Sequence, residues 1–109
     1  MTGWLVTARF LKPNINAMAL FPFILIREDA MRNDKVLLNH ERIHLRQQAE
    51  LLVLPFYILY LLNYLLSLAR YRRHYPAYRN ISFEREAYDK EADLHYLGRR
   101  RWYNWLAYL

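Results

Sequence analysis

The residues with the clearest potential for chemistry lie in the segment HERIH, residues 40–44, which fits the pattern H-E-x-x-H. If this segment is helical, His40 and His44 lie one turn apart on the same face, with Cβ atoms about 5–6 Å apart. Two imidazoles at this spacing can share one zinc ion, and Glu41 then points toward a water molecule on the same metal. Such a site also needs a third ligand from elsewhere in the chain and an open fourth position.

Composition restricts the ligands that could complete this site. The chain has 109 residues and no cysteine, which excludes both a disulfide framework and a thiolate zinc site. The only other imidazoles belong to His74 and His95, so a third ligand is one of these or a carboxylate. Hydrophobic residues make up 55% of the chain, and there are only two Gly and four Pro, which excludes a disordered or low-complexity protein. The length indicates a single domain over residues 1–109.

The formal charge of +6 is the main compositional sign of a partner. It suits a membrane surface, nucleic acid or an acidic substrate, although a basic soluble domain explains the charge equally simply. The first residues, MTGW, lack the basic region of a secretory signal. We therefore expect a cytoplasmic protein, with peripheral membrane contact as an open alternative and no specific nucleic-acid binding.

The N-terminal part of the chain predicts a small antiparallel sheet. Residues 4–10 (WLVTARF) alternate as in a strand, and residues 12–16 (KPNIN) have turn composition. Residues 18–28 (MALFPFILIRE) are rich in β-branched and aromatic side chains, and Pro22 confines that end of the strand to an edge. This second strand either fills the core or lies beside a cleft and pairs with an extended peptide.

Residues 35–54 predict the helix that the HERIH segment requires. They contain no Gly or Pro, and Asn33 or Asp34 can cap the helix N-terminus. Helical spacing places Val36, Leu37, His40, His44, Gln47 and Leu51 on one broad face.

The uncharged segment 51–69 (LLVLPFYILYLLNYLLSLA) has two interpretations. Its 19 residues could span a bilayer, which would leave the following chain on the far side of the membrane from His40. A break at Pro55 would instead form an antiparallel helical hairpin, buried or touching a membrane, that returns the chain to His40. We favour the hairpin.

The chain then continues with a predicted loop and a second polar helix. Residues 70–82 (RYRRHYPAYRNIS) read as a solvated connector, although Arg interleaved with Tyr also suits single-stranded nucleic acid. Residues 83–97 predict a helix that ends at Gly98. One face of this helix carries a polar stripe formed by Glu84, Tyr88, Glu91 and His95. The whole chain thus predicts an α+β fold, with the sheet followed by a mostly helical part.

HERIH followed by Glu84-Arg85-Glu86-Ala87, 40 residues after His44, resembles the gluzincin metallopeptidases. Members of this family carry H-E-x-x-H on one helix and a glutamate ligand on a second helix, often within E-x-x-A-D. The small size makes the chain look most like the minigluzincins, which are single-domain members with a short sheet and a few helices. The resemblance covers residues 36–93 loosely and is specific at the two motifs.

The resemblance implies a zinc-dependent peptidase site acting on a peptide or protein. In it His40, His44 and Glu84 bind Zn²⁺, and Glu41 is the general base. One departure concerns the position four residues after the glutamate ligand, where the family commonly has Asp and this chain has Tyr88, followed by Asp89. That Asp usually orients a ligand histidine, so here the orientation depends on Tyr88 or on another carboxylate.

This ligand set has a chemical logic of its own. Two neutral imidazoles and one carboxylate leave a water on the zinc with a pKa lowered to about 7, and Glu41 can take its proton and return it to the leaving amine. An electrophile for the oxyanion is still needed. The candidates are Tyr71, His74, Tyr75, Tyr78 and Tyr88.

The competing hypothesis is a non-enzymatic, membrane-associated interaction module. Residues 99–109 (RRRWYNWLAYL) would place Trp102, Trp105, Leu106 and Leu109 on one helical face beside three Arg, as in an interfacial anchor. The same residues could equally form an apolar helix packed on the domain. Bound zinc would favour the enzyme, and lipid binding without metal would favour the module.

Overall fold

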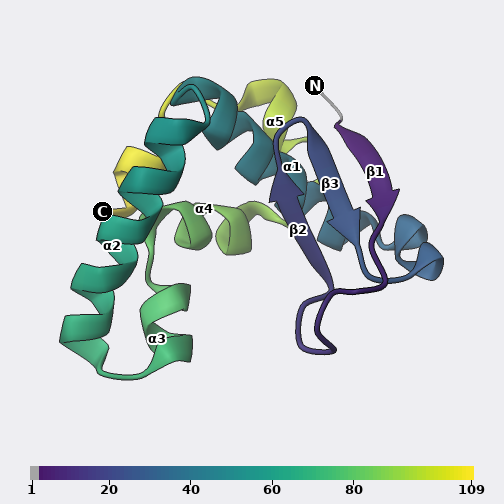
Figure 1. The fold of residues 1–109 in the computed structure, drawn as a ribbon. Coiled ribbons are helices and arrows are strands. Elements are labelled where there is room, and N and C mark those ends of the chain that lie inside the picture. The colour runs from purple at the N-terminus through teal and green to yellow at the C-terminus, as the bar shows by residue number, and fades with distance from the viewer. Residues whose placement is uncertain (1–2) are drawn as a thin grey trace.

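The computed structural model describes residues 3–109 and shows three strands followed by a mostly helical part, which confirms the α+β class (Figure 1). The strands are β1 (Trp4–Thr7), β2 (Ala17–Leu20) and β3 (Phe23–Ile26). The helices are α1 (Lys35–Glu50), α2 (Leu54–Tyr71), α3 (His74–Arg79), α4 (Ser82–Lys90) and α5 (Tyr96–Arg99), and two 3-10 helices are η1 (Asp29–Asn33) and η2 (Asn104–Tyr108).

The sheet differs from the expected one in strand number and direction. The segment predicted as one strand over residues 18–28 forms both β2 and β3, because the chain reverses at the cis Phe21–Pro22 peptide. The strand order is β1-β3-β2, with β2 and β3 antiparallel but β1 and β3 parallel. The prediction of a purely antiparallel sheet was therefore wrong. The central position goes to β3, which carries the fully buried Ile24 and Ile26.

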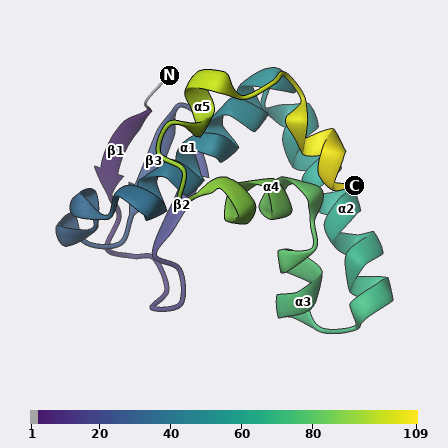
Figure 2. The same ribbon diagram turned by 180° about the vertical axis from the view of Figure 1, so that it is seen from behind.

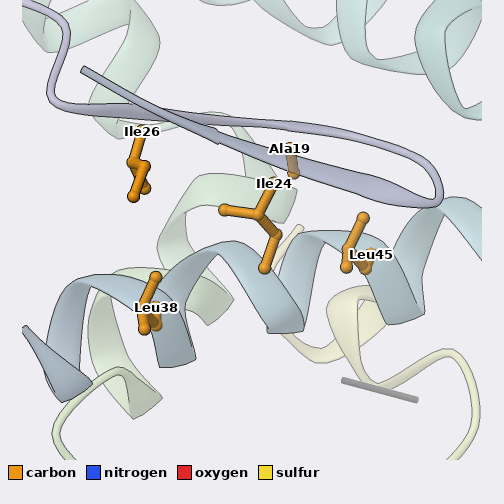
Figure 3. Packing of buried hydrophobic residues seen from close by; sticks show 5 residues of the cluster. All are labelled: Ala19, Ile24, Ile26, Leu38 and Leu45. Atoms are coloured by element: carbon orange, nitrogen blue, oxygen red, sulfur yellow. The ribbon is translucent and has the colours of Figure 1, made fainter. Parts of the chain in front are cut away.

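Helix α1 packs its apolar side against one face of this sheet. Leu38 and Leu45 of α1 pack with Ile24 and Ile26 of β3 and with Ala19 of β2, and all five side chains are buried (Figure 3). Burying an aliphatic side chain of this size stabilises the fold by roughly 1.5–3 kcal/mol. This contact fixes the orientation of α1 and leaves its opposite side, with the HERIH residues, facing the other helices.

The predicted helix at HERIH is present, with the expected N-cap. The Asp34 carboxylate accepts a hydrogen bond from the Leu37 backbone N–H at 3.0 Å. The helix stops at Glu50, four residues before its predicted end, and Leu52 and Val53 turn the chain with positive φ angles of 59° and 63°. Such angles are unusual for branched residues and store backbone strain.

Helix α2 leaves this turn at 112° to α1, with Pro55 in its first turn. Proline is tolerated there because its missing N–H would have had no intrahelical partner. The expected break at Pro55 is thus present, but the two helices form an open bend in place of an antiparallel hairpin. Within residues 3–109, no single helix is long and apolar enough to span a membrane, and only α1 and α2 taken together as this bent pair meet that test.

The chain returns toward α1 through α3 and α4. Residues 74–79 form α3 where a loop was predicted, and α3 lies back along α2 after a left-handed turn at Arg72 (Figures 1 and 2). The polar side chains of α2 hold this return. Ser67 donates to the Ala77 carbonyl at 2.8 Å, and Asn63 donates to Ser82 Oγ at 2.9 Å.

Helix α4 ends at Lys90, so the single helix predicted over residues 83–97 was wrong. The cause is Asn39 on α1, whose amide donates to the carbonyls of Glu91 at 2.8 Å and Asp93 at 2.9 Å. These bonds satisfy carbonyls in the turn that follows the helix, where solvent or another helical turn would otherwise be needed. Gly98 does not end a helix, because it lies inside the short α5.

The C-terminal segment does not form the amphipathic helix considered for residues 99–109. Trp105 in η2 is buried against Phe83, with ring centroids 4.7 Å apart, whereas Trp102, Leu106 and Leu109 are exposed. The segment is thus partly packed on the domain, through one tryptophan.

Candidate metal centre

Three side chains that could hold a metal ion converge between α1 and α4. His40 and His44 project from one side of α1, with ring centroids 4.9 Å apart, and Glu84 comes from the first turn of α4. One Glu84 oxygen, Oε1, lies 3.3 Å from His40 Nε2 and 3.0 Å from His44 Nε2. All three side chains are buried, and one ligand atom from each lies within 4.8 Å of the others. The structure therefore brings together the three predicted ligands.

The remaining nitrogen of each imidazole has its own partner. His40 Nδ1 lies 3.0 Å from Glu91 Oε1, and His44 Nδ1 lies 2.8 Å from Gln47 Oε1. The orientation of the Gln47 amide follows from its surroundings, because its nitrogen donates to the Phe83 carbonyl and to Glu86 Oε1. Both Nδ1 atoms therefore act as N–H donors, as is usual for metal-binding histidines.

Counting protons shows why a cation suits this arrangement. All four imidazole nitrogens face an oxygen acceptor, but a neutral imidazole has only one N–H. With both Nδ1 atoms protonated, two Nε2 lone pairs point at one carboxylate oxygen. These lone pairs and the carboxylate oxygen repel one another unless a positive charge lies between them, and a metal ion would supply that charge. Zinc bonded at 2.0–2.2 Å to tetrahedral ligands would hold the ligand atoms roughly 3.3–3.6 Å apart, near the 3.3 and 3.0 Å that separate Glu84 Oε1 from the two Nε2 atoms. The donor set fits a zinc-like ion.

Without a metal, charge in this buried centre shifts proton affinities. Burial alone would lower the pKa of His44, but the charge and hydrogen bond of Glu84 raise it to about 9. Burial likewise opposes ionisation of Glu84, and the two histidines nevertheless hold its pKa well below its ordinary value. The metal-free centre thus stores protons that a divalent ion would replace.

Glu41, the predicted general base, lies on α1 beside the ligands and is buried with them. The four side chains His40, Glu41, His44 and Glu84 are only 5–7% exposed. Burial raises the pKa of the Glu41 carboxyl, while the neighbouring His44 and His40 act to lower it. These exposures leave the centre open to solvent through at most a narrow gap.

Two tyrosines complete the immediate surroundings of the centre. Tyr60, on the inner side of α2, donates a hydrogen bond to the second Glu84 oxygen, Oε2, at 2.7 Å. Tyr88, on α4, packs its ring edge-on against His40, with ring centroids 4.4 Å apart. The Arg79 guanidinium lies over the Tyr88 ring, 3.8 Å from its centroid. Tyr60 therefore fixes the orientation of the carboxylate ligand, and Tyr88 supports one imidazole by contact.

The structure selects among the predicted supporting residues. Neither Tyr88 nor Asp89 hydrogen-bonds a ligand histidine, because Tyr88 bonds Tyr78 and Asp89 accepts from Tyr108. Glu91 is the carboxylate that orients His40. Its place in the polar stripe of residues 83–97 was the sequence signal for this role.

The oxyanion candidates divide in a similar way. Tyr71, His74 and Tyr75 are exposed at the end of α2 and on α3, and His74 bonds Tyr64. Tyr78 and Tyr88 bond each other beside the centre. Tyr60 was missed, although Tyr60, Asn63 and Ser67 form a polar stripe on the inner side of an otherwise apolar helix, which could have identified it.

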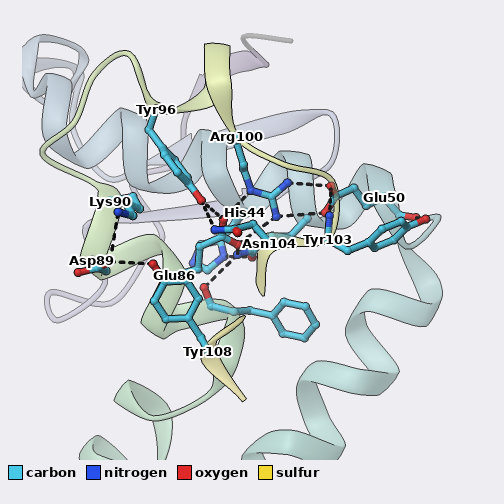
Figure 4. Close-up of polar contacts among 12 residues, drawn as sticks. His44, Glu50, Glu86, Asp89, Lys90, Tyr96, Arg100, Tyr103, Asn104 and Tyr108 are labelled. Atoms are coloured by element: carbon cyan, nitrogen blue, oxygen red, sulfur yellow. Dashed lines mark hydrogen bonds and ion pairs between the residues drawn. The ribbon is translucent and has the colours of Figure 1, made fainter. Parts of the chain in front are cut away.

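A buried ion network lies beside His44 (Figure 4). The Arg100 guanidinium donates to Glu86 at 2.6 and 3.0 Å and to Glu50 at 2.7 and 3.1 Å, with all three side chains almost fully buried. Glu86 also accepts from Gln47, which holds His44. The network therefore joins the C-terminal segment to a ligand histidine through two intervening side chains.

The edge of the sheet beside α1 does not offer a free strand at Ala19. The Ala19 carbonyl accepts hydrogen bonds from Gln48 Nε2 at 3.0 Å and the Tyr57 hydroxyl at 3.3 Å, and the Phe21 N–H donates to Gln48 Oε1 at 2.9 Å. A peptide adding to β2 there would have to displace these side chains. Core packing is thus the better supported role of this strand.

In comparisons with known proteins, no family model, curated protein or solved structure matches this chain.

Proposed function

We propose that this protein is a zinc-dependent metallopeptidase in which His40, His44 and Glu84 bind the metal and Glu41 is the general base. The observation that carries the proposal is the convergence of two Nε2 atoms on one Glu84 oxygen, while both Nδ1 atoms are held by other side chains. A simple histidine–glutamate salt bridge would not require both imidazoles to direct Nε2 at the same carboxylate oxygen.

Zinc is the metal that best suits two imidazoles and one carboxylate in a compact, buried site. When bound, it would lower the pKa of a coordinated water to about 7 and polarise a substrate carbonyl.

The residues of the chain have separate tasks in this reaction. The Glu41 carboxylate accepts a proton from the attacking water and later donates it to the leaving amine nitrogen. Glu91 and Gln47 keep the imidazoles in the tautomer that leaves Nε2 free of a proton, and Tyr60 holds the Glu84 carboxylate in place. The low exposure of the centre excludes bulk water, which strengthens these electrostatic effects.

Metal binding and peptide hydrolysis by point variants test the proposal together. We expect one equivalent of zinc per chain, measured by elemental analysis after mild dialysis. His44→Ala and Glu84→Ala should lose the metal, whereas Glu41→Gln should retain it and lose casein hydrolysis. His95→Ala is the matched control, because His95 is exposed and lies outside the cluster. Metal far below one equivalent in protein prepared with zinc rejects the site, and a Glu41→Gln variant that cleaves at the parent rate rejects the assigned base.

A catalytically inactive metal-binding interaction module is the second candidate function. The observation that favours it is the small exposed fraction of the ligands and Glu41, which leaves little room for a peptide. This candidate predicts stoichiometric metal in the parent protein, with no hydrolysis in either the parent or Glu41→Gln.

A further inference from the structure

Helix α2 has two sides of opposite character. Its inner side packs on the domain through Phe56, which is buried against Phe83 with ring centroids 4.7 Å apart, and through the hydrogen bonds of Tyr60, Asn63 and Ser67. Its outer side carries large apolar side chains that stay exposed to solvent. They are Leu54, Ile58, Leu59, Leu61, Leu62, Leu65 and Leu66.

This outer side forms a continuous surface. Leu54, Ile58, Leu61 and Leu65 follow one another at i+4 and i+3 spacing, and each is about half exposed or more, up to 67% for Leu54. Singly exposed apolar residues are normal in globular proteins, but a contiguous apolar face over about three and a half helical turns marks an interaction surface. Figure 1 shows α2 along one side of the molecule, with most of its length directed away from the sheet, so this surface is free to meet a flat partner.

Positive charge is placed at one end of the apolar surface. Leu62, Leu66 and Arg70 lie in one row at i, i+4 and i+8, and Arg72 and Arg73 follow at the end of the helix. All three arginines are exposed, and none forms an ion pair within the part of the chain that the structure describes. Residues 51–83 contain no Asp or Glu at all. The surface is therefore apolar and cationic, with nothing anionic along it.

We propose that the outer side of α2 binds an anionic lipid surface, with the helix lying in the plane of the membrane. The leucines and Ile58 would enter the boundary between headgroups and acyl chains, and Arg70, Arg72 and Arg73 would contact lipid phosphates. A second copy of the chain suits this surface less well, because it would bring one acid-free, cationic face against another. The proposal does not depend on the metal centre, although Tyr60 on the inner side of the same helix would place that centre close to the membrane.

Vesicle co-sedimentation tests this proposal. We expect the protein to bind vesicles containing phosphatidylcholine and phosphatidylserine, to bind pure phosphatidylcholine vesicles much more weakly, and to be released as salt increases. Leu66→Asn should weaken partitioning about tenfold, because it removes a side chain that inserts. Arg72→Gln with Arg73→Gln should weaken it about 25-fold on anionic vesicles only, from about fivefold for each arginine.

Matched controls come from exposed residues that precede α2 in the chain and lie outside it. Phe10→Asn removes an apolar side chain that is 82% exposed, against 74% for Leu66, and Lys12→Gln with Lys35→Gln removes the same two charges from exposed positions. These variants should bind as the parent does. Because the chain has no cysteine, single cysteines at positions 62 and 10 can also carry an environment-sensitive dye, which should shift to the blue on vesicles at position 62 alone.

Two outcomes would overturn the proposal. One is equal binding of the α2 variants and their controls, which would indicate unspecific attraction by the net charge. The other is absence of vesicle binding together with a stable dimer that Leu66→Asn converts to monomer in sedimentation equilibrium, which would assign the surface to a second copy of this chain.

Discussion

The imidazole of His40 depends on a residue that no motif contains. Glu91 lies in the turn after α4 and holds His40 Nδ1 at 3.0 Å, a position it reaches because Asn39 ends the helix just before it. We expect Glu91→Gln to weaken zinc affinity about 10–100-fold without removing the site, because the ligands themselves remain. Competition with a chromogenic chelator measures this loss. Asp89→Asn is the control, since Asp89 bonds Tyr108, and an equal loss in both variants would show that Glu91 has no special role.

The raised pKa of His44 makes the stability of the metal-free protein depend on pH. Its pKa is about 9 in the folded chain and about 6.5 in an unfolded one, so between these values the folded state binds more protons. The free energy of unfolding should therefore fall as pH rises from about 6.5 to 9, and the full contribution is present below 6.5. Urea unfolding of chelator-treated protein at several pH values measures the slope. The slope should shrink in His44→Gln, and an unchanged slope in this variant would assign it to other groups.

At the scale of elements, the Arg100 network joins α1, α4 and the chain after α5. Arg100 pairs with Glu50 at the end of α1 and with Glu86 in the middle of α4, and burial keeps these charges away from water. Arg100→Ala would leave two buried carboxylates without a partner, which costs about 3–5 kcal/mol. Chemical or thermal unfolding measures this loss. Arg101→Ala changes the next residue, which is exposed, and should have little effect on stability, so similar losses in both variants would contradict a special role for the network.

At the scale of the whole molecule, the bend between α1 and α2 decides how the chain returns to the metal centre. At 1.5 Å per residue, a straight helix would separate residues 37 and 66 by about 44 Å. A bend of 112° at the midpoint of this stretch brings the same two positions to about 24 Å of each other, since each arm is about 22 Å long. Spin labels on Leu37→Cys and Leu66→Cys, in a chain without other cysteines, measure the distance. A distance near 44 Å would contradict the bend.

The sequence by itself determined those features of the site that depend on spacing along one helix. HERIH lies on a helix capped by Asp34, and its two histidines share one face because helical periodicity alone places them there. Glu84 was found because a polar residue on a second helix matched the pattern of a known family. The α+β order of elements likewise follows from local composition along the chain.

The tertiary structure alone decided which side chains support those ligands and where the elements end. Asn39 of α1 bonds the turn after α4, and Glu91 and Tyr60 reach the ligands from that turn and from α2. The parallel pairing of β1 with β3 also depends on a contact between distant segments. Each of these features is a contact between residues that are far apart in sequence. Helical or strand periodicity, which relates near neighbours only, does not predict such a contact. The buried ion network around Arg100 is the clearest case, because its three charged residues look like ordinary surface residues until the fold removes them from water.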